Sequence, residues 1–363
     1  MFKTPLFSVL FSSFLCACGA DKDTSDTGSD TSDDSITNTS SIHDSETISS
    51  DTTWNGSHTV NGILTINSTL TIEACSTIKM SANSSISIRD GGRLLSQGSE
   101  DCMVTFTSSS SNPDSGDWGY IELYTNGNVF DWTTIEYAGN DYASLWIDGS
   151  GSASITNSTF AYSDSGIEVV GDGSMTNFQN NTFMNMKEFI MSVTTTQVSS
   201  LNPITSIDNT NNFIIIKNST LEENGTWKNV SVPYKTSGFS LNADVTVEAG
   251  TVFLMEEYTY ILVNDSGSLV NNGTESEPIL YTSASEIPQS DDWGYFDLYS
   301  NGNVFDWTIV EYAGNDYASI YCNDNSSISI RNSTFRDSNK AIEFHLGSTI
   351  HAFENNNFQR IQE

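Results

Sequence analysis

Carboxylates recur with one spacing in two parts of the chain. Asp117, Asp131, Glu136 and Asp141 have counterparts at a constant offset further along, which are Asp292, Asp306, Glu311 and Asp316. Two or three carboxylates on one face could hydrolyse a glycosidic bond as general acid and base. The whole set is duplicated, however, and one catalytic cleft is not expected twice. We therefore predict turn and solvation roles, assign no catalytic residue, and keep catalysis as the alternative.

Aromatic residues gather in the same stretch. Eight of them fall between Trp118 and Trp146 inclusive, and all but Trp146 recur unchanged at the same offset, where Tyr321 replaces it. Outward-facing rings beside carboxylates suit stacking on sugar faces. The candidate glycan-binding residues are therefore Asp141, Tyr142, Trp146, Asp316, Tyr317 and Tyr321. The alternative is that these rings only cover the sheet where a loop crosses it.

Basic and metal-binding residues give weaker signals. A polysaccharide lyase needs a strong base, but the closest basic pair, Arg331 and Arg336, corresponds to Thr156 and Ala161 in the first copy. The four histidines are His43, His58, His345 and His351. No pair of them has a metal-ligand context, so we predict no metal site and no cofactor, with calcium as an open option.

These residues belong to a long internal repeat. Asp117–Ser144 and Asp292–Ser319 are identical at 23 of 28 positions. Each copy also contains a shorter period, because the phrase at Asn157–Phe160 returns at Asn180–Phe183. Such a period, with two or three short alternating strands in it, is typical of one coil of a β-helix. Residues 54–363 would form roughly thirteen coils along an axis of about 60 Å.

Two alternating segments indicate which side chains point inward, and the asparagines indicate the turns. Ile155 and Ile167 keep apolar counterparts in the second copy, Ile330 and Ile342, so we expect them in the core. The repeated asparagine before Ser/Thr-x-Phe should sit at a turn. There its amide can stack on the asparagine of the next coil.

The cysteines fit an exported protein. Cys75 and Cys102 are separated by close to one coil, which would bring their Cα atoms to about 5 Å. We predict a disulfide between them. Cys322 aligns with the inward position Ile147 and should be an inert core thiol.

Several phrases resemble bacterial cell-surface proteins with right-handed parallel β-helix repeats of the pectin-lyase-like superfold. They are Thr226–Asn229, Val245–Gly250 and Val310–Gly314. The likeness covers nearly everything from Trp54 onward. It implies an all-β, right-handed parallel β-helix solenoid, but it does not imply one activity, since a fold does not determine function.

The N-terminus predicts export and lipid anchoring. Residues 1–18 contain a lysine, an apolar run too short to span a bilayer, and the phrase Leu15-Cys16-Ala17-Cys18, which resembles the bacterial lipobox. By that resemblance Cys18 carries the acyl chains and attaches the protein to a membrane. Gly19 favours the outer membrane or cell surface of the bacterial envelope.

The remaining chain divides into a tether and two modules. Residues 19–53 are rich in Ser, Thr and Asp and should be disordered. Modules follow at 54–226 and 227–363. The net charge of −33 argues against nucleic acid as a partner and leaves polysaccharide as a possible one. We expect a non-catalytic scaffold, adhesin or glycan-binding lipoprotein; the alternative is a polysaccharide lyase or glycoside hydrolase.

Overall fold

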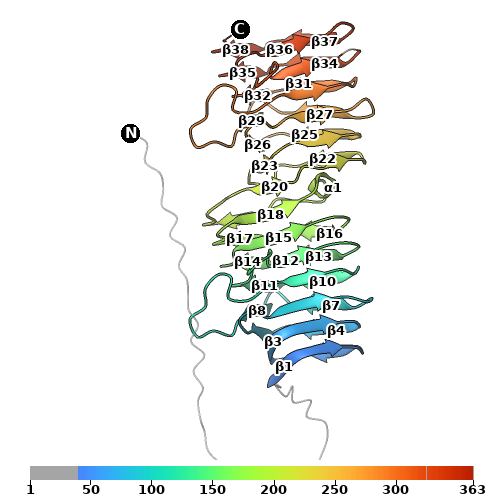
Figure 1. Ribbon diagram of the computed structural model, residues 1–363, viewed down its shortest axis with the longest axis vertical. Coiled ribbons are helices and arrows are strands. Elements are labelled where there is room, and N and C mark those ends of the chain that lie inside the picture. The colour runs from blue at the N-terminus through green and yellow to red at the C-terminus, as the bar shows by residue number, and fades with distance from the viewer. Residues whose placement is uncertain (1–39, 324, 363) are drawn as a thin grey trace, which may run out of the picture. The chain divides into compact units, whose positions relative to one another are not determined.

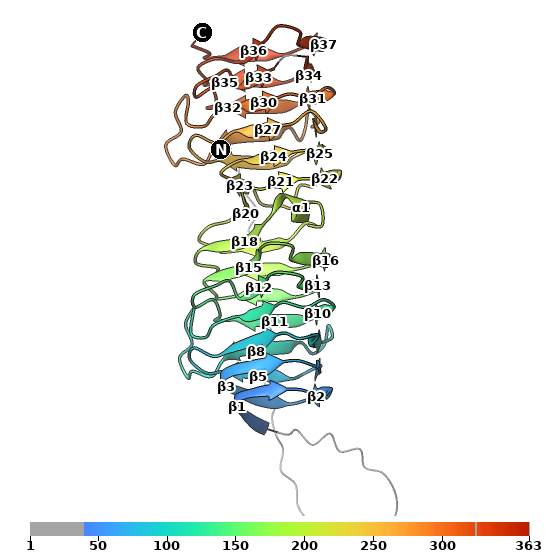
Figure 2. The same cartoon turned by 45° about the vertical axis from the view of Figure 1, so that its right-hand side comes forward.

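The protein is a right-handed parallel β-helix. The computed structural model describes residues 40–323 and 325–362. Short strands wind in successive coils, and each strand pairs in parallel with the strands one coil below and above it (Figures 1 and 2). The all-β parallel solenoid expected from the repeat is thereby confirmed.

The largest sheet has 20 strands and spreads from one long strand. The first half of β3 (Ser57–Ile66) pairs with β5 (Thr77–Met80), and its second half pairs with β6 (Ser85–Ile88). The other strands of this sheet are β1 (Ser40–Ile48), β8 (Val104–Ser108), β9 (Ile121–Leu123), β11 (Thr133–Glu136), β12 (Leu145–Ile147), β14 (Thr159–Ala161), β15 (Ser165–Val169), β17 (Thr182–Met184), β18 (Phe189–Val193), β19 (Thr205–Ile207), β20 (Ile214–Ile216), β23 (Tyr234–Thr236), β26 (Val252–Met255), β29 (Ile279–Ser283), β32 (Thr308–Glu311), β35 (Thr334–Arg336) and β38 (Asn357–Gln359).

Three six-stranded sheets complete the coils. The first contains β2 (Thr52–Trp54), β4 (Thr69–Glu73), β7 (Arg93–Gln97), β10 (Asn128–Asp131), β13 (Ser152–Thr156) and β16 (Ser174–Gln179). The second contains β22 (Gly225–Trp227), β25 (Asp244–Glu248), β28 (Ser268–Asn272), β31 (Asn303–Asp306), β34 (Ser327–Arg331) and β37 (Thr349–Glu354). The third contains β21 (Thr220–Leu221), β24 (Phe239–Leu241), β27 (Ile261–Val263), β30 (Phe296–Leu298), β33 (Ile320–Cys322) and β36 (Ile342–Phe344). A single helical turn, α1 (Thr195–Val198), follows β18.

The core is a stack of inward-facing apolar side chains. Strand residues alternate between faces, so every second residue lies inside the coil. Ile155, Ile167 and Ile330 are fully buried, as predicted, whereas Ile342 is half-buried near the last coil. From β3 onward the longest ladder runs through thirteen consecutive strands, in agreement with the coil number expected for residues 54–363, and β1 adds one strand before them. The thirteen are β3, β6, β9, β12, β15, β18, β20, β23, β26, β29, β32, β35 and β38.

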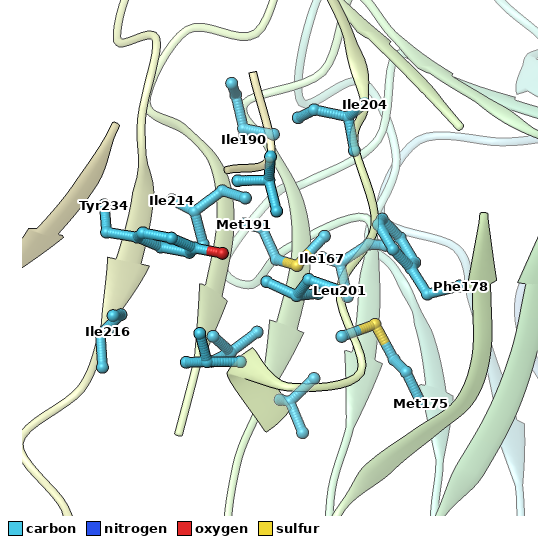
Figure 3. Close-up of a cluster of buried hydrophobic side chains, with 14 of the residues drawn as sticks. Ile167, Met175, Phe178, Ile190, Met191, Leu201, Ile204, Ile214, Ile216 and Tyr234 are labelled. Carbon is cyan, nitrogen blue, oxygen red and sulfur yellow. The ribbon is translucent and has the colours of Figure 1, made fainter. Parts of the chain in front are cut away.

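The two repeats are joined with a shift of one sheet. Ile167 in β15 is the repeat counterpart of Ile342 in β36, yet its ladder continues through Met191 and Ile214 to Tyr234 in β23 (Figure 3). It then enters β26 and the strands above it, which correspond to β5 and its successors in the first repeat. Some equivalent residues therefore lie on different sheets: Trp146 in β12 belongs to the 20-stranded sheet, whereas its counterpart Tyr321 in β33 belongs to a six-stranded sheet.

The expected tether boundary is wrong in its last part. Residues 40–53 fall within the segment expected to be disordered, but β1 pairs with β3 over residues 40–48, and β2 begins at Thr52. Ser41, His43 and Ile48 contribute side chains to the first coil, and a strong strand partner outweighs a polar composition. The boundary expected at 226/227 also falls inside β22. Cys18 and residues 19–39 lie outside the described residues.

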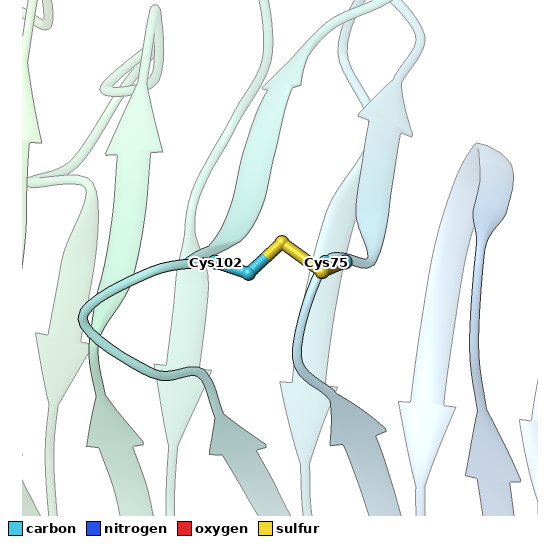
Figure 4. Close-up of a disulfide and its surroundings, with 2 residues drawn as sticks. All are labelled: Cys75 and Cys102. Carbon is cyan, nitrogen blue, oxygen red and sulfur yellow. A yellow bond between two sulfur atoms is a disulfide. The ribbon is translucent and has the colours of Figure 1, made fainter.

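Turn asparagines and the disulfide follow the predictions. Asn180 Nδ2 donates to Asn157 Oδ1 at 3.1 Å, and Asn355 does the same to Asn332 at 3.1 Å. All four adopt positive φ, which asparagine tolerates better than most residues. Cys75 and Cys102 form a disulfide with Cα atoms 4.9 Å apart (Figure 4). Among the described residues, no helix is long and apolar enough to cross a membrane.

Candidate glycan-binding surface

The duplicated carboxylates hold turns together. Asp117 Oδ2 accepts hydrogen bonds from the Ser108 hydroxyl at 2.7 Å and from the Asp114 amide at 3.1 Å. Asp131 Oδ1 accepts from Thr156 and Asn157, and in the second copy Asp292 and Asp306 accept from equivalent donors. Glu136 and Glu311 likewise accept from threonine hydroxyls at 2.7 Å. These contacts explain the duplication as structural.

The first candidate surface surrounds Trp146 in β12. Its ring contacts Tyr142 edge-on at 4.4 Å between centroids, and Tyr142 contacts Tyr120 at 4.8 Å. Tyr142 is 45% exposed. With Tyr124 and two carboxylates, these rings line a shallow hollow of about 170 Å³. The structure thus brings together the predicted Trp146 and Tyr142; Asp141 is exposed at the turn just before them, with a positive φ.

Carboxylates flank Trp146 along the outward row, but basic residues neutralise them. Glu122 and Glu168 lie on the strands directly below and above Trp146. Arg89 contacts Glu122 at 2.7 Å, and Lys217 contacts Glu168 at 2.6 Å. The first surface therefore offers aromatic faces, and the two carboxylates in the row of Trp146, Glu122 and Glu168, are already paired with basic residues.

The second surface differs from the predicted one. Tyr321 occupies the outward row of β33 but is only 9% exposed, because Tyr317 and Tyr295 pack over it and its hydroxyl hydrogen-bonds the His345 ring. The prediction of an exposed Tyr321 ring is therefore wrong. Tyr317 is exposed beside it, and Asp316 is exposed in the turn that precedes it.

A larger hollow lies next to this cluster. It is on the six-stranded sheet from β21 to β36, whose strands can be followed in Figure 2. It measures about 700 Å³ and is lined by three tyrosine rings, those of Tyr260, Tyr295 and Tyr299, together with Asp297 and Asn264. Tyr260 stacks on Tyr295 with centroids 6.1 Å apart. The duplicated aromatic stretch contains Tyr295 and Tyr299. The sequence does not identify Tyr260 as a candidate, because its counterpart in the first repeat is Ser85 and it lies outside the duplicated aromatic stretch.

Burial changes the acid–base behaviour of this hollow. Burial raises the pKa of Asp297, opposed by a hydrogen bond from Asn323. Burial also raises the pKa of Tyr295 to about 12, and the negative charge of Asp297 adds to this. At neutral pH the Tyr295 hydroxyl is therefore a neutral donor and acceptor. Such groups, set among aromatic faces, can bind sugar hydroxyls.

The described residues contain no group of three or more His, Cys, Asp or Glu side chains placed to hold a metal ion. The family is decided by a comparison with family models. The model of a pectate-lyase-like beta helix domain matches residues 46–153 and 218–331, one segment in each repeat and together more than half of the chain. The chain belongs to this pectate-lyase-like β-helix family. A search among curated proteins found no match. Membership in the family accounts for the coils, and it leaves the chemistry of the two surfaces to be argued from their own residues.

Proposed function

We propose that this pectate-lyase-like β-helix protein is a lipid-anchored glycan-binding module of the bacterial cell envelope, attached through Cys18. The observation that carries the binding proposal is the 700 Å³ hollow with its three tyrosine rings. Tyr260 and Tyr299 are 50% and 43% exposed. Each ring can therefore contact a ligand on its exposed side while its other side stays packed on the sheet. Sugar rings stack on such faces through their C–H surfaces.

The charge distribution favours a neutral glycan. The chain carries a net charge of −33, and Asp265 and Asp297 line the hollow. A polyuronate would be repelled by this field, whereas a neutral polysaccharide would not. The two surfaces, around Trp146 and around Tyr260, would both contact a long polymer, which would increase its apparent affinity over that of an oligosaccharide.

The test is a calorimetric titration with neutral polysaccharides, and with pectate as the charged comparison. Tyr260→Ala and Tyr299→Ala should each weaken binding about 2- to 12-fold, the range expected for loss of one aromatic contact. Tyr162→Ala is the matched control, since this ring is 40% exposed but stacks on Tyr137 away from the hollow. Unchanged binding by the double variant, or preference for pectate, would contradict the proposal.

Hydrolysis is the second candidate, and the raised pKa of Asp297 is the observation that favours it. An upward shift of a carboxyl pKa is the direction that a general acid acting on a glycosidic oxygen requires. No lysine or arginine is found among the described residues lining the hollow, so a lyase base is not supplied there. A reducing-sugar assay separates the candidates: product that disappears in Asp297→Asn would establish hydrolysis, and binding without product would support the binding module.

A further inference from the structure

Two imidazole rings and an indole ring pack together in the first coil of the β-helix. His43 lies on β1, and His58 lies on β3, the strand that pairs with it. Both imidazoles stack on Trp54, at 4.2 Å and 4.4 Å between centroids, and their own centroids are 5.3 Å apart. Rings on opposite faces of the indole would be further from each other. Both imidazoles therefore lie on the same face of Trp54, edge to edge.

The outer partners of the two rings determine where two of their protons lie. His43 Nδ1 is 2.6 Å from Glu46 Oε1, and His58 Nε2 is 2.9 Å from the Asn55 carbonyl oxygen. A carboxylate and a carbonyl oxygen can only accept, so each of these ring nitrogens carries a proton. A neutral imidazole has a single N–H group. If both rings were neutral, the inner nitrogens, His43 Nε2 and His58 Nδ1, would both present lone pairs.

The inner nitrogens are placed for a hydrogen bond that two neutral rings cannot form. They are 3.0 Å apart and face each other along one line. One additional proton on either ring turns this contact into an N–H···N hydrogen bond. The Ser41 hydroxyl, 2.9 Å from His43 Nε2 and 2.7 Å from His58 Nδ1, can then accept from one ring and donate to the other. A single added proton therefore satisfies both inner nitrogens and the hydroxyl.

The surroundings favour the positive charge on His43. Its Nδ1–H group faces the Glu46 carboxylate, and its ring lies on the Trp54 indole, whose face attracts a cation. His58 is only 5% exposed. Burial lowers the pKa of His58, and a positive charge on His43 lowers it further, against the hydrogen bond to the Asn55 carbonyl. His58 is therefore the neutral ring, and a second proton would set two N–H groups against each other.

The other charged groups on the strands around the pair point elsewhere. Asp44 is exposed next to His43 on β1, and Lys79 is exposed on β5, where it pairs with Thr59. Neighbouring residues of a strand point to opposite faces, so neither side chain is directed at the two imidazoles. Strands β2 and β3 contain no Asp, Glu, Lys or Arg. The charged neighbour of the pair on these strands is thus Glu46.

We propose that His43 and His58 share one proton while β1 is attached, so that the attachment of β1 to the β-helix depends on pH. In released β1 the rings are ordinary imidazoles, which titrate near about pH 6.5. Below that pH the released state holds two protons and the attached state one, so attachment strengthens as the pH rises. Above it the released state holds none, so attachment weakens as the pH rises further. A difference of one proton changes the attachment equilibrium up to about tenfold per pH unit on each side.

Release of β1 would have a structural consequence. The strand covers one edge of β3 over residues 40–48, and its His43 ring covers part of Trp54. An uncovered strand edge offers free backbone N–H and C=O groups to another chain. The shared proton thus closes the first coil within a limited range of pH.

Hydrogen exchange of the full chain, followed by mass spectrometry, measures attachment as the protection of residues 40–48 after correction for the intrinsic effect of pH on exchange. In the wild type, protection should be greatest near about pH 6.5 and fall on both sides. His43→Gln removes the charged ring, so it should keep the fall toward acid pH, which comes from His58, and lose the fall toward alkaline pH. His351→Ala, which removes an exposed histidine from the last coil, is the matched control and should keep both.

Glu46→Gln tests the same charge on an exposed side chain, and its fall toward alkaline pH should begin at a lower pH than in the wild type. Nitrogen NMR of histidine-labelled protein gives a second readout. Near about pH 6.5 it should show one imidazolium, His43, and one neutral ring, His58, protonated at Nε2. Protection of residues 40–48 that does not change with pH would overturn the proposal. So would an equal alkaline fall in the wild type and His43→Gln, or two rings in the same charge state at that pH.

Discussion

At the scale of single residues, buried asparagine side chains form hydrogen bonds with backbone groups at the corners of the coils. Asn181, one position after the exposed Asn180, is fully buried. Its Oδ1 accepts from the Ser158 amide at 3.0 Å, and its Nδ2 donates to the Ile155 carbonyl at 2.9 Å. Asn356 makes the same two contacts in the second repeat. A buried amide thus satisfies backbone groups that the corner of the coil leaves without strand partners.

Asn181→Ala should lower the free energy of unfolding by about 2–4 kcal/mol, since it leaves one buried donor and one buried acceptor without partners. The matched control is Asn180→Gly, which removes an exposed amide but tolerates the positive φ at this position, and which should cost less than about 1 kcal/mol. Urea denaturation measures both. Equal losses in the two variants would show that the inner asparagine has no special role.

Cys322 is a buried, unpaired thiol in β33. Burial raises its pKa to about 12. At pH 8 we expect iodoacetamide to leave it unmodified in the native protein and to modify it quickly in urea, as peptide mapping would show. The folded state favours the neutral thiol, so its contribution to stability is complete below the ordinary thiol pKa and declines as the pH rises toward 12. Ready labelling of the native protein would place Cys322 outside the core.

At the scale of elements, the coil is the unit of stability, and one coil is covalently closed. The disulfide joins Cys75, between β4 and β5, to Cys102, just before β8. Cys75 has a φ of 67°, close to the 74° of its repeat counterpart Gly250. The second repeat therefore keeps the turn without the crosslink, and the turn does not depend on the bond.

The double variant Cys75→Ala, Cys102→Ala should fold and lose about 3–4 kcal/mol in free energy of unfolding, the value expected for opening a loop with a sequence separation of 27. Non-reducing peptide mapping of the wild type should recover the two cysteine peptides joined. A double variant with an unchanged urea midpoint would show that stacked coils alone hold this loop closed.

At the scale of the whole molecule, the connection between the two repeats determines on which sheets the Trp146 surface and the Tyr260 hollow lie. The ladder formed by β5, β8, β11, β14, β17 and β19 ends at β19. A new sheet begins at β21, which contacts α1. Because of this shift, the Trp146 surface and the Tyr260 hollow lie on different sheets, although they come from one duplicated sequence. A bound polymer would have to follow the column from one sheet to the next.

The anchor gives a prediction at this scale as well. Cys18→Ser should release the protein from the membrane fraction into a soluble one, because an apolar run of about a dozen residues cannot span a bilayer. Fractionation followed by immunoblotting measures this, with Cys16→Ser as the matched control that should remain attached. Membrane attachment of the Cys18→Ser protein would rule out lipidation at that position.

Much of this architecture follows from the sequence alone, because it depends on local periods. The two-residue alternation identified Ile155 and Ile330 as core residues, and the period of one coil placed Asn157 on Asn180. The one-coil separation paired Cys75 with Cys102. In a stacked solenoid, residues one coil apart become neighbours, so sequence distance translates directly into contact.

Other features were decided only by the tertiary structure. β20 pairs with β18 on one side and with β23 on the other, while β21 begins a new sheet, and this change of partners shifts the sheets. The exposure of a ring depends on neighbours from other coils, as the covering of Tyr321 shows. His43 lies beside His58 because the polar segment β1 pairs with the edge of β3. The composition of a segment does not show whether such a strand partner is available.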